Sequence, residues 1–462
     1  MPKKVKDLDA SAIERLKAGT RGPVILPGDA DYDQECRLYN AMIQKRPGMI
    51  VKCADPGDVM GAVNFAREND ILTAIRGGGH NGGGLGSCDD GVVISLSGIK
   101  YTRVDTESQT VRVGGGNTWG ETDHATHPFG LAIPGGVIST TGVGGLTLGG
   151  GIGHLTRKYG LSIDNLLEAD LVLANGEFVT VSEHSHPDLF WAIRGGGGNF
   201  GVATSFKFQA HPVKNVYGGP TLWPIEKTPE MMAWYDEFLH QAPDELNGFF
   251  VQLMIPGPPF PEHLHHKAFC GVVWCYAGEE AMAEDIFRPV LAQEPVFQHL
   301  GSMPYPAIQR LFDGLLPPGL QWYWKADFFN ESTEDSRKVH LEFGLNPPTL
   351  LSQMHLYPVS GAAARVAADA TAWAYRDAKY SGVIIGVDPL PENAPKITQW
   401  CKDYWQKLHP YSMGGAYLNF IMDEGQDRVK AGYGRNYQRL RQVKRKYDPD
   451  NFFRVNQNIL PE

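Results

Sequence analysis

RGGGHNGGGLG, at residues 76–86, is the first of three glycine-rich segments in one part of this chain. The others are PGGVISTTGVGGLTLGGGIG at 134–153 and RGGGGNFG at 194–201. A glycine costs about 1 kcal/mol in an ordered element, so runs this dense favour close approach of a ligand over merely flexible loops. Backbone amides without side chains can line an extended path for anions. The three segments therefore predict a long ligand that carries phosphate.

Two of these segments contain the pattern GxGxxG, at 77–82 and at 196–201. In a nicotinamide-binding Rossmann domain, this pattern follows a strand and opens a helix whose N-terminus holds the pyrophosphate. Here the first match is followed by SCDDGVVISL and the second by VATSFKF, and both continuations are typical of strands. The sequence therefore argues against a nicotinamide cofactor.

The glycine-rich region also carries clear signals for secondary structure. DPGDVMGAVNFAREN (55–69) predicts a helix, because Asp and Pro cap a run with apolar residues at helical spacing. The pair Asn175-Gly176 predicts a hairpin, because it readily supplies the positive φ angles of a type I′ turn. Strands are expected in the β-branched runs at 91–96, 110–115, 169–182 and 203–209.

A second region, from about 214 to 400, has fewer glycines and many prolines. Aromatic-rich runs at 231–241 and 363–380 predict helices, and runs at 249–255 and 271–277 predict strands. We interpret this region as a second, α+β domain.

Several segments, taken together and in order, resemble FAD-binding proteins of the vanillyl-alcohol oxidase type, and most of all the berberine bridge enzyme-like and 6-hydroxy-D-nicotine oxidase-like oxidoreductases. The resemblance covers nearly the whole chain. It implies an α+β fold in two lobes, with a PCMH-type FAD-binding domain and a separate α+β substrate domain. The segments that carry it are RGGGHN (76–81), FGLAIPGG (129–136), TGVGGLTLGGGIGHLTRKYGLSIDN (141–165), DLFWAIRGGGGNFGVAT (188–204) and YGRNYQRLRQVKRKYDPDNFFRVNQNILP (433–461).

The domain boundaries follow from this resemblance and from the change in composition. We expect an FAD-binding domain at 30–213, a substrate domain at 214–410 and a C-terminal segment at 411–462 that returns to the FAD-binding domain. In that last segment, a strand is expected at 417–422, then an amphipathic helix at 433–447 and an ordered tail.

The resemblance also implies how FAD is attached. The histidine of RGGGH carries an 8α-histidyl bond to the flavin in such proteins, and here it is His80. Many relatives have a second, cysteinyl bond just before the TxGVGG turn, but this chain has Ile138 there. A single covalent link is therefore expected. Thr141 stands where relatives place Val or Ile beside the flavin, which leaves oxygen reactivity open.

Further FAD contacts are implied by the resemblance alone. They include Asn456, for which a capped tail is the alternative interpretation. The expected cofactor-binding residues are Arg76, Gly77, Gly78, Gly79, His80, Asn81, Thr141, Gly142, Gly144, Gly145, Gly149, Asp164, Asn165, Val202, Asn419 and Asn456.

The implied reaction moves a hydride from a small organic substrate to flavin N5, while a base takes the adjacent proton and O2 reoxidises the flavin. Tyr417 in AYLNF occupies the place where relatives often have an active-site tyrosine, and alternate strand positions would turn Asn419 the same way. A tyrosine needs a cation to act as a base at neutral pH, and Lys325 could supply it. Tyr323 and His355 are the other candidates.

The substrate could be an alcohol, amine, sugar or secondary-metabolite intermediate. The aromatic run 322–324 favours an aromatic or alicyclic substrate over a highly charged one, with core packing as the alternative. A flavin dehydrogenase with another electron acceptor, and a flavin-bearing binding protein without turnover, remain rival functions.

Composition excludes other classes. The net charge of −10 gives no support to nucleic-acid binding. The six cysteines are sparse, the N-terminus lacks the apolar core of a signal peptide, and no apolar run could span a membrane, so we expect a cytoplasmic monomer or homodimer. The HLHH run at 263–266 fits no standard zinc spacing, and no metal is expected.

Overall fold

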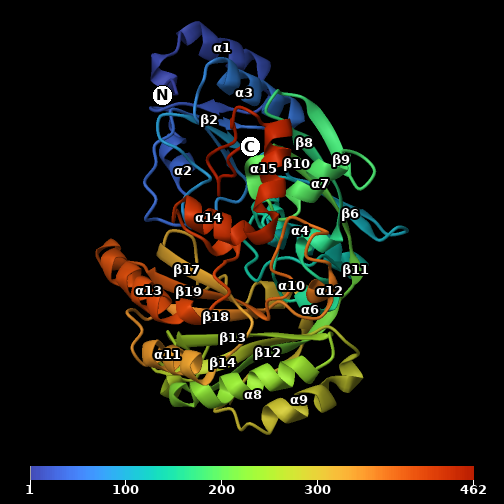
Figure 1. Cartoon of the computed structure of the whole chain (residues 1–462), viewed down its shortest axis with the longest axis vertical. Coiled ribbons are helices and arrows are strands. Elements are labelled where there is room, and N and C mark those ends of the chain that lie inside the picture. The colour runs from blue at the N-terminus through green and yellow to red at the C-terminus, as the bar shows by residue number, and fades with distance from the viewer. Residues whose placement is uncertain (1) are drawn as a thin grey trace.

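The computed structural model describes residues 2–462 and has two lobes, with the N-terminal half of the chain in one and the middle of the chain in the other (Figure 1). The first lobe begins with a four-stranded sheet in the order β1-β2-β4-β3. Strands β2, β4 and β3 are parallel, and β1 joins their edge antiparallel. The strands are β1 (Val24–Ile25), β2 (Met49–Lys52), β3 (Thr73–Arg76) and β4 (Val92–Ser95).

The crossover between β2 and β3 is the helix expected from the sequence. Helix α3 (Pro56–Glu68) starts where Asp55 accepts a hydrogen bond from the Asp58 amide, and it buries an apolar face against the sheet. Helix α1 (Ala10–Gly19) packs beside it. Because β3 ends at Arg76, this crossover delivers the first glycine segment to the carboxyl edge of the sheet.

A five-stranded antiparallel sheet completes this lobe, in the order β5-β6-β10-β8-β9. The expected hairpin is confirmed, because β8 and β9 pair around Asn175-Gly176 and Gly176 has a φ of +85°. The strands are β5 (Thr102–Asp105), β6 (Thr110–Gly114), β8 (Leu166–Val172), β9 (Phe178–Ser182) and β10 (Val202–Gln209).

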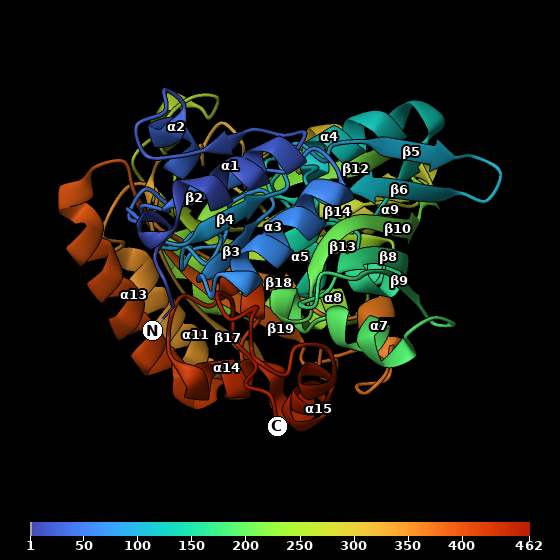
Figure 2. The same ribbon diagram turned by 90° about the horizontal axis from the view of Figure 1, so that it is seen from above.

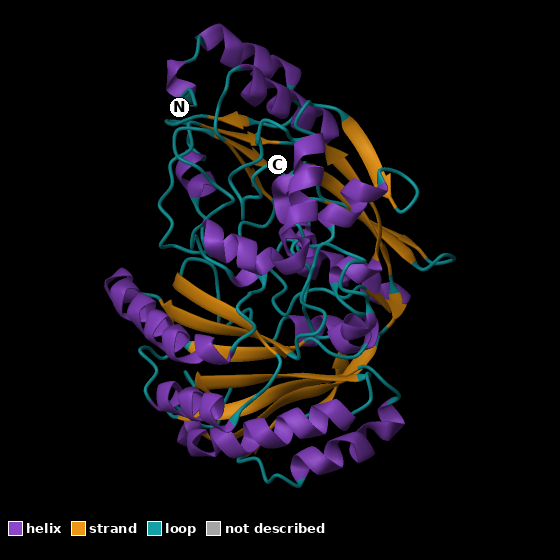
Figure 3. Ribbon diagram, viewed as in Figure 1, coloured by secondary structure: helices purple, strands orange, loops and turns teal. Residues whose placement is uncertain are grey.

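The second lobe is an antiparallel sheet in the order β15-β12-β14-β13-β18-β19-β17, with β16 also paired to β12. One face packs on helices, and the other turns toward the first lobe (Figure 3). The strands are β12 (Asn215–Pro224), β13 (Leu246–Met254), β14 (Ala268–Tyr276), β15 (Phe297–Gln298), β16 (Gly301–Pro304), β17 (Gln321–Phe329), β18 (Gln353–Pro358) and β19 (Tyr380–Asp388). The outer helices are α8 (Thr228–Gln241), α9 (Ala283–Leu291), α11 (Glu334–Leu345) and α13 (Ala394–Leu408).

The C-terminal part of the chain returns to the first lobe (Figure 2). Lys444, which is fully buried, donates hydrogen bonds to the carbonyls of Asn199 and Phe453 and pairs with Asp448. The tail is thereby fixed against the third glycine segment. Two helices precede it, α14 (Gln426–Tyr433) and α15 (Tyr437–Tyr447).

Short elements connect these parts. The two-stranded pair β7 (Leu131–Ala132) and β11 (His211–Pro212) lies beside the large sheets. The short helices are α2 (Tyr32–Cys36), α4 (Trp119–Thr126), α5 (Val143–Leu148), α6 (Thr156–Tyr159), α7 (Pro187–Ile193), α10 (Tyr305–Gln309) and α12 (Ala362–Arg365).

Two expectations about local structure are wrong. The helix expected at 363–380 is reduced to α12, because the side-chain amide of Asn436 donates to the carbonyls of 368, 371 and 372 and holds that backbone in turns. The strand expected at 417–422 is instead a 3-10 turn at Leu418–Phe420, and no strand pairs with it. The period-2 pattern there reflected side chains buried at a lobe boundary, not a sheet.

Candidate active site

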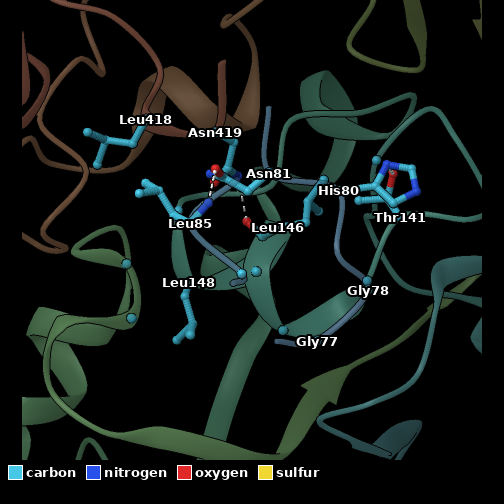
Figure 4. A pocket seen from close by; sticks show the side chains of 18 of the residues that line it. Gly77, Gly78, His80, Asn81, Leu85, Thr141, Leu146, Leu148, Leu418 and Asn419 are labelled. Atoms are coloured by element: carbon cyan, nitrogen blue, oxygen red, sulfur yellow. Dashed lines mark hydrogen bonds between the residues drawn. The ribbon is translucent and has the colours of Figure 1, made fainter. Parts of the chain in front are cut away.

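A cavity of about 300 Å³ lies where the glycine segments meet the inner face of the second lobe (Figure 4). Its lining comes from all three glycine segments, from β17, β18 and β19, from the 3-10 turn and from the C-terminal tail. The expected cofactor-binding residues that line it are Arg76, Gly77, Gly78, Gly79, His80, Asn81, Thr141, Gly142, Gly144, Gly145, Gly149, Asn419 and Asn456.

His80 lies in the wall of this cavity. Its ring stacks on Tyr39, with centroids 3.9 Å apart and planes 19° apart. Its Nε2 lies 3.0 Å from Thr140 Oγ1 and its Nδ1 lies 3.4 Å from Thr141 Oγ1. Burial lowers the pKa of His80 to about 4, so the imidazole is neutral at physiological pH. A neutral, positioned imidazole offers an unprotonated nitrogen as a nucleophile.

The first two glycine segments cross in direct backbone contact. A Cβ on Gly78 would lie 2.5 Å from the Gly142 amide nitrogen, and a Cβ on Gly142 would lie 2.4 Å from that of Gly78. These two glycines therefore serve packing of chain against chain, and not only close approach of a ligand as the sequence suggested. The crossing brings Thr140 and Thr141 to His80.

Other glycines open into the cavity. Gly145 and Gly198 have no atom within 4 Å of an added Cβ, and both line the cavity. Asn456 donates to the carbonyls of Gly198 and Phe453, but its buried Oδ1 has no hydrogen-bond partner within residues 2–462. An elongated, side-chain-free trough with an unpartnered buried acceptor fits a ligand of the length and polarity of FAD.

Tyr417 and Asn419 meet at the other end of the cavity. Tyr417 is buried, and its Oη accepts hydrogen bonds from the Gly151 amide at 2.8 Å and from Asn419 Nδ2 at 2.7 Å. Asn419 also donates to the Leu146 carbonyl, as Figure 4 shows. Burial raises the pKa of Tyr417 to about 12, and the N–H donors oppose that rise.

His355 lines the cavity from β18 and is buried. Its Nδ1 lies 2.7 Å from Tyr357 Oη, and its Nε2 lies 2.8 Å from Gln353 Oε1. Burial lowers the pKa of His355 to about 3. Of the four side chains expected to be catalytic, only His355 and Tyr417 line the cavity.

Tyr323 and Lys325 do not reach the cavity. Side chains alternate along β17, so Trp322 and Trp324 line the cavity while Tyr323 and Lys325 lie on the opposite face, toward α13. Lys325 pairs there with Glu424 and lies 4.5 Å over the ring of Trp405. The interpretation of Lys325 as the cation beside Tyr417 is therefore wrong, and N–H donors occupy that place instead.

Three of the expected FAD contacts also lie outside the cavity. Asp164 is buried and accepts two 2.7 Å hydrogen bonds from Arg376. Asn165 bonds to His211 and to two backbone carbonyls. Val202 is packed in the core beside α3. The glycine-rich context drew attention to residues that join the lobes or fill the core.

Sequence reasoning missed several lining residues. Tyr39 carried no local signal, because it lies far from the glycine segments and meets His80 only through tertiary packing. Tyr357 could have been found, since it stands two residues after His355 on one strand and must share its face. The other missed aromatic lining residues are Phe312 and Phe420.

No cluster of metal-ligating side chains occurs among residues 2–462, and within the same range no helix is long and apolar enough to cross a membrane. The histidines at 263–266 lie in a surface turn.

Comparison with known proteins decides the family. The family described as FAD binding domain matches residues 47–182, and the one described as berberine and berberine like matches 416–460. An FAD-linked oxidoreductase of Dictyostelium discoideum is 35% identical, with 95% of each chain covered. The chain belongs to the berberine bridge enzyme-like, FAD-linked oxidoreductases.

Other members of the family agree in sequence and in structure. (R)-6-hydroxynicotine oxidase of Paenarthrobacter nicotinovorans is 29% identical, with 96% of this chain and 97% of that one covered. The crystal structure of 6-hydroxy-D-nicotine oxidase from Arthrobacter nicotinovorans superposes with a TM-score of 0.85 at 26% identity, over 96% of this chain and 98% of that one. Berberine bridge enzyme from Eschscholzia californica shares the fold, with a TM-score of 0.86 at 20% identity over 98% and 99% of the two chains.

Proposed function

We propose that this oxidoreductase holds FAD through a single covalent bond from His80 and oxidises a small organic alcohol, amine, sugar or secondary-metabolite intermediate, with O2 as the final electron acceptor. The observation that carries the proposal is the position of His80. Its neutral ring is clamped between Tyr39 and the hydroxyls of Thr140 and Thr141 in the wall of a glycine-lined cavity.

When bound, FAD supplies the acceptor for a hydride from the substrate. The chain's own residues do the rest. The trough around Gly145 and Gly198 holds the elongated ligand, and the uncharged aromatic wall of Trp322 and Trp324 excludes water from the reacting carbon. His355 and Tyr417 are the cavity residues from the expected catalytic set, and they supply the polar contacts to the substrate.

Two observations support a single attachment. Ile138 lines the cavity near the crossing of the glycine segments, and it has no nucleophile. The chain's six cysteines are all buried away from the cavity lining. His80 is therefore the residue proposed to carry the flavin.

The test is denaturing precipitation of purified protein, followed by visible spectroscopy and mass spectrometry of the His80 peptide. Wild type should give a yellow pellet and a peptide heavier by one FAD. His80→Ala should give a colourless pellet, whereas His263→Ala, which changes an exposed histidine, should behave as wild type. A colourless wild-type pellet would contradict covalent attachment.

A flavin dehydrogenase is the second candidate function, and Thr141 favours it. Its hydroxyl lies 3.4 Å from His80 Nδ1, where the resemblance implies that relatives have an apolar side chain that affects oxygen access. Measurement of hydrogen peroxide under air separates the two functions. An oxidase forms one peroxide for each substrate oxidised, and a dehydrogenase needs an added electron acceptor.

A further inference from the structure

The cavity holds no obvious base. Arg76 is the one charged side chain in its lining, as far as residues 2–462 are concerned, and it is engaged by the carbonyl and carboxylate of Glu35. No aspartate, glutamate or lysine lines the cavity. A substrate that loses a hydride from carbon must also lose a proton from its hydroxyl or amine, so the acceptor has to be a neutral group.

Strand β18 arranges three polar side chains in a row on one face. Gln353, His355 and Tyr357 are two residues apart, and so point the same way. Tyr357 Oη lies 2.7 Å from His355 Nδ1, and His355 Nε2 lies 2.8 Å from Gln353 Oε1. His355 and Tyr357 line the cavity, while Gln353 stands behind them.

The chemistry of Gln353 fixes the direction of these hydrogen bonds. Its Nε2 donates to the Leu351 carbonyl, which leaves Oε1 facing His355. An amide oxygen can only accept, so His355 Nε2 carries the proton and Nδ1 does not. Tyr357 must therefore donate its own proton to Nδ1. The lone pairs of Tyr357 Oη are left to accept a hydrogen bond.

Nothing around His355 competes with this arrangement. The pairing strands place Val251 of β13 and Val383 of β19 opposite it, and Phe249 and Phe312 pack on its ring. None of these groups titrates, and Tyr357 is its one titratable hydrogen-bond partner. Burial holds the pKa of His355 near 3 and raises that of Tyr357, so His355 is neutral and Nδ1 remains an acceptor at every pH above about 4.

Tyr417 is placed for the opposite role. Its oxygen already accepts from the Gly151 amide and from Asn419, so its remaining capacity is to donate its own O–H. The cavity thus offers one phenol as a donor and one as an acceptor.

We propose that Gln353, His355 and Tyr357 form a neutral proton relay in which Tyr357 Oη accepts the proton that the substrate loses. The proposal rests on the proposed function, since bound FAD is the oxidant that takes the hydride and its two electrons. The substrate O–H or N–H bond breaks and its proton goes to Tyr357. The proton of Tyr357 passes to His355 Nδ1, and His355 later releases it to water. Gln353 is a positioning residue.

The first test reads the tautomer of His355 directly, by NMR of the holoenzyme labelled with ¹⁵N-histidine. The His355 signal is assigned by its loss in His355→Gln. Wild type should show a protonated Nε2 and an unprotonated Nδ1 from pH 5.5 to 8.5. Protonation at Nδ1 in this range would overturn the proposal. Because this signal needs no turnover, it stands even if the flavin proves not to be covalent.

Gln353→Glu provides the sharpest variant. Its carboxylate stabilises a proton on the imidazole, so Nδ1 should become protonated as the pH falls from 8.5 to 5.5. A merely structural role for Gln353 would leave His355 unchanged. Tyr357→Phe should shift the Nδ1 signal, because the hydrogen bond to Nδ1 is lost, without protonating it.

The second test asks whether Tyr357 accepts from a hydroxyl. The probes are 4-methylphenol, which can donate, and 4-methylanisole, which cannot, and their binding is followed by the flavin absorption. Wild type should prefer the phenol about fivefold, which is the effect of one hydrogen bond. Tyr357→Phe should lose the preference, and Gln353→Glu should lose it only at low pH. Tyr323→Phe, on the opposite face of the sheet, should keep it. Equal binding of both probes to wild type, or binding of neither, would overturn the proposal.

Discussion

Asn419 Nδ2 donates a hydrogen bond to Tyr417 Oη over 2.7 Å, and the backbone leaves just enough room for it. A Cβ on Gly149 would lie 2.2 Å from Asn419 Oδ1. The second glycine segment therefore sets the position of an amide that orients a buried tyrosine. Glycine here is a requirement of a side chain 270 residues further along the chain.

Replacing Asn419 by Leu should leave the Gly151 amide as the donor seen at Tyr417 in this pairing. The pKa of Tyr417 should rise further, and unfolding should become easier by about 1–3 kcal/mol, because a buried phenol loses a partner. Gly149→Ala should have the same effect on the flavin spectrum, because it displaces the same amide. Thermal denaturation and the visible spectrum of the holoenzyme measure both. If Gly149→Ala leaves the spectrum unchanged while Asn419→Leu shifts it, the two residues are not coupled.

The glycines of the cavity should separate into two classes on substitution. Gly78→Ala places a Cβ against the backbone of Gly142, which cannot move aside, and should lower stability by about 1–3 kcal/mol or more and lower flavin content as well. Gly145→Ala meets open space and should fold as wild type does, but should bind less flavin.

Flavin-to-protein ratio and urea unfolding measure these two effects separately. Gly61→Ala in α3, where an added Cβ also meets no atom within 4 Å, is the matched control and should be neutral or stabilising. Full flavin content in Gly145→Ala would contradict the assignment of the trough to FAD.

Much of the fold could be predicted because local signals agreed with tertiary structure. The capped helix after Asp55 and the Asn175-Gly176 hairpin are determined by residues a few positions apart. The segment 363–380 could not be predicted, because its helical composition is overridden by one distant side chain, Asn436. Propensity is a weak guide where a buried amide satisfies the backbone instead.

The candidate site divides in the same way. His80 and its glycine neighbours were found because the motif itself carries them, whereas Tyr39, which stacks on His80, has no local signal. On β17 the sequence indicated the aromatic run but not which face it presents. A shift of one residue separates Trp324, in the cavity, from Lys325, outside it.

Asp164 offers a test of structural against cofactor-binding roles. Its carboxylate forms a buried, two-pronged ion pair with Arg376, and neither residue lines the cavity. Asp164→Asn should therefore destabilise the protein by about 3–5 kcal/mol, because it leaves a buried guanidinium without its counter-charge. The flavin content of the folded fraction should stay at the wild-type level. Loss of flavin without loss of stability in urea would instead make Asp164 a cofactor ligand.

Asp123 on α4 should make stability depend on pH in an unusual direction. It is buried against α10, where Gln309 Nε2 donates to Oδ2 over 3.3 Å and Oδ1 has no partner among residues 2–462. Burial raises the pKa of Asp123 to about 7. A carboxyl whose pKa is raised on folding stabilises the fold below its unfolded pKa of about 4, and that contribution is lost as the pH rises toward 7.

Asp123→Asn removes the ionisation and keeps the shape. The variant should match wild type at pH 4 and exceed its free energy of unfolding increasingly up to pH 7, by on the order of 2–4 kcal/mol, with no further gain above. Urea unfolding at pH 4.5, 6 and 8 measures this trend. Asp313→Asn is a comparison variant, since Asp313 also joins the lobes but accepts two hydrogen bonds from Ser139. A gain for Asp123→Asn that is the same at all three pH values would show that Asp123 is not the titrating group.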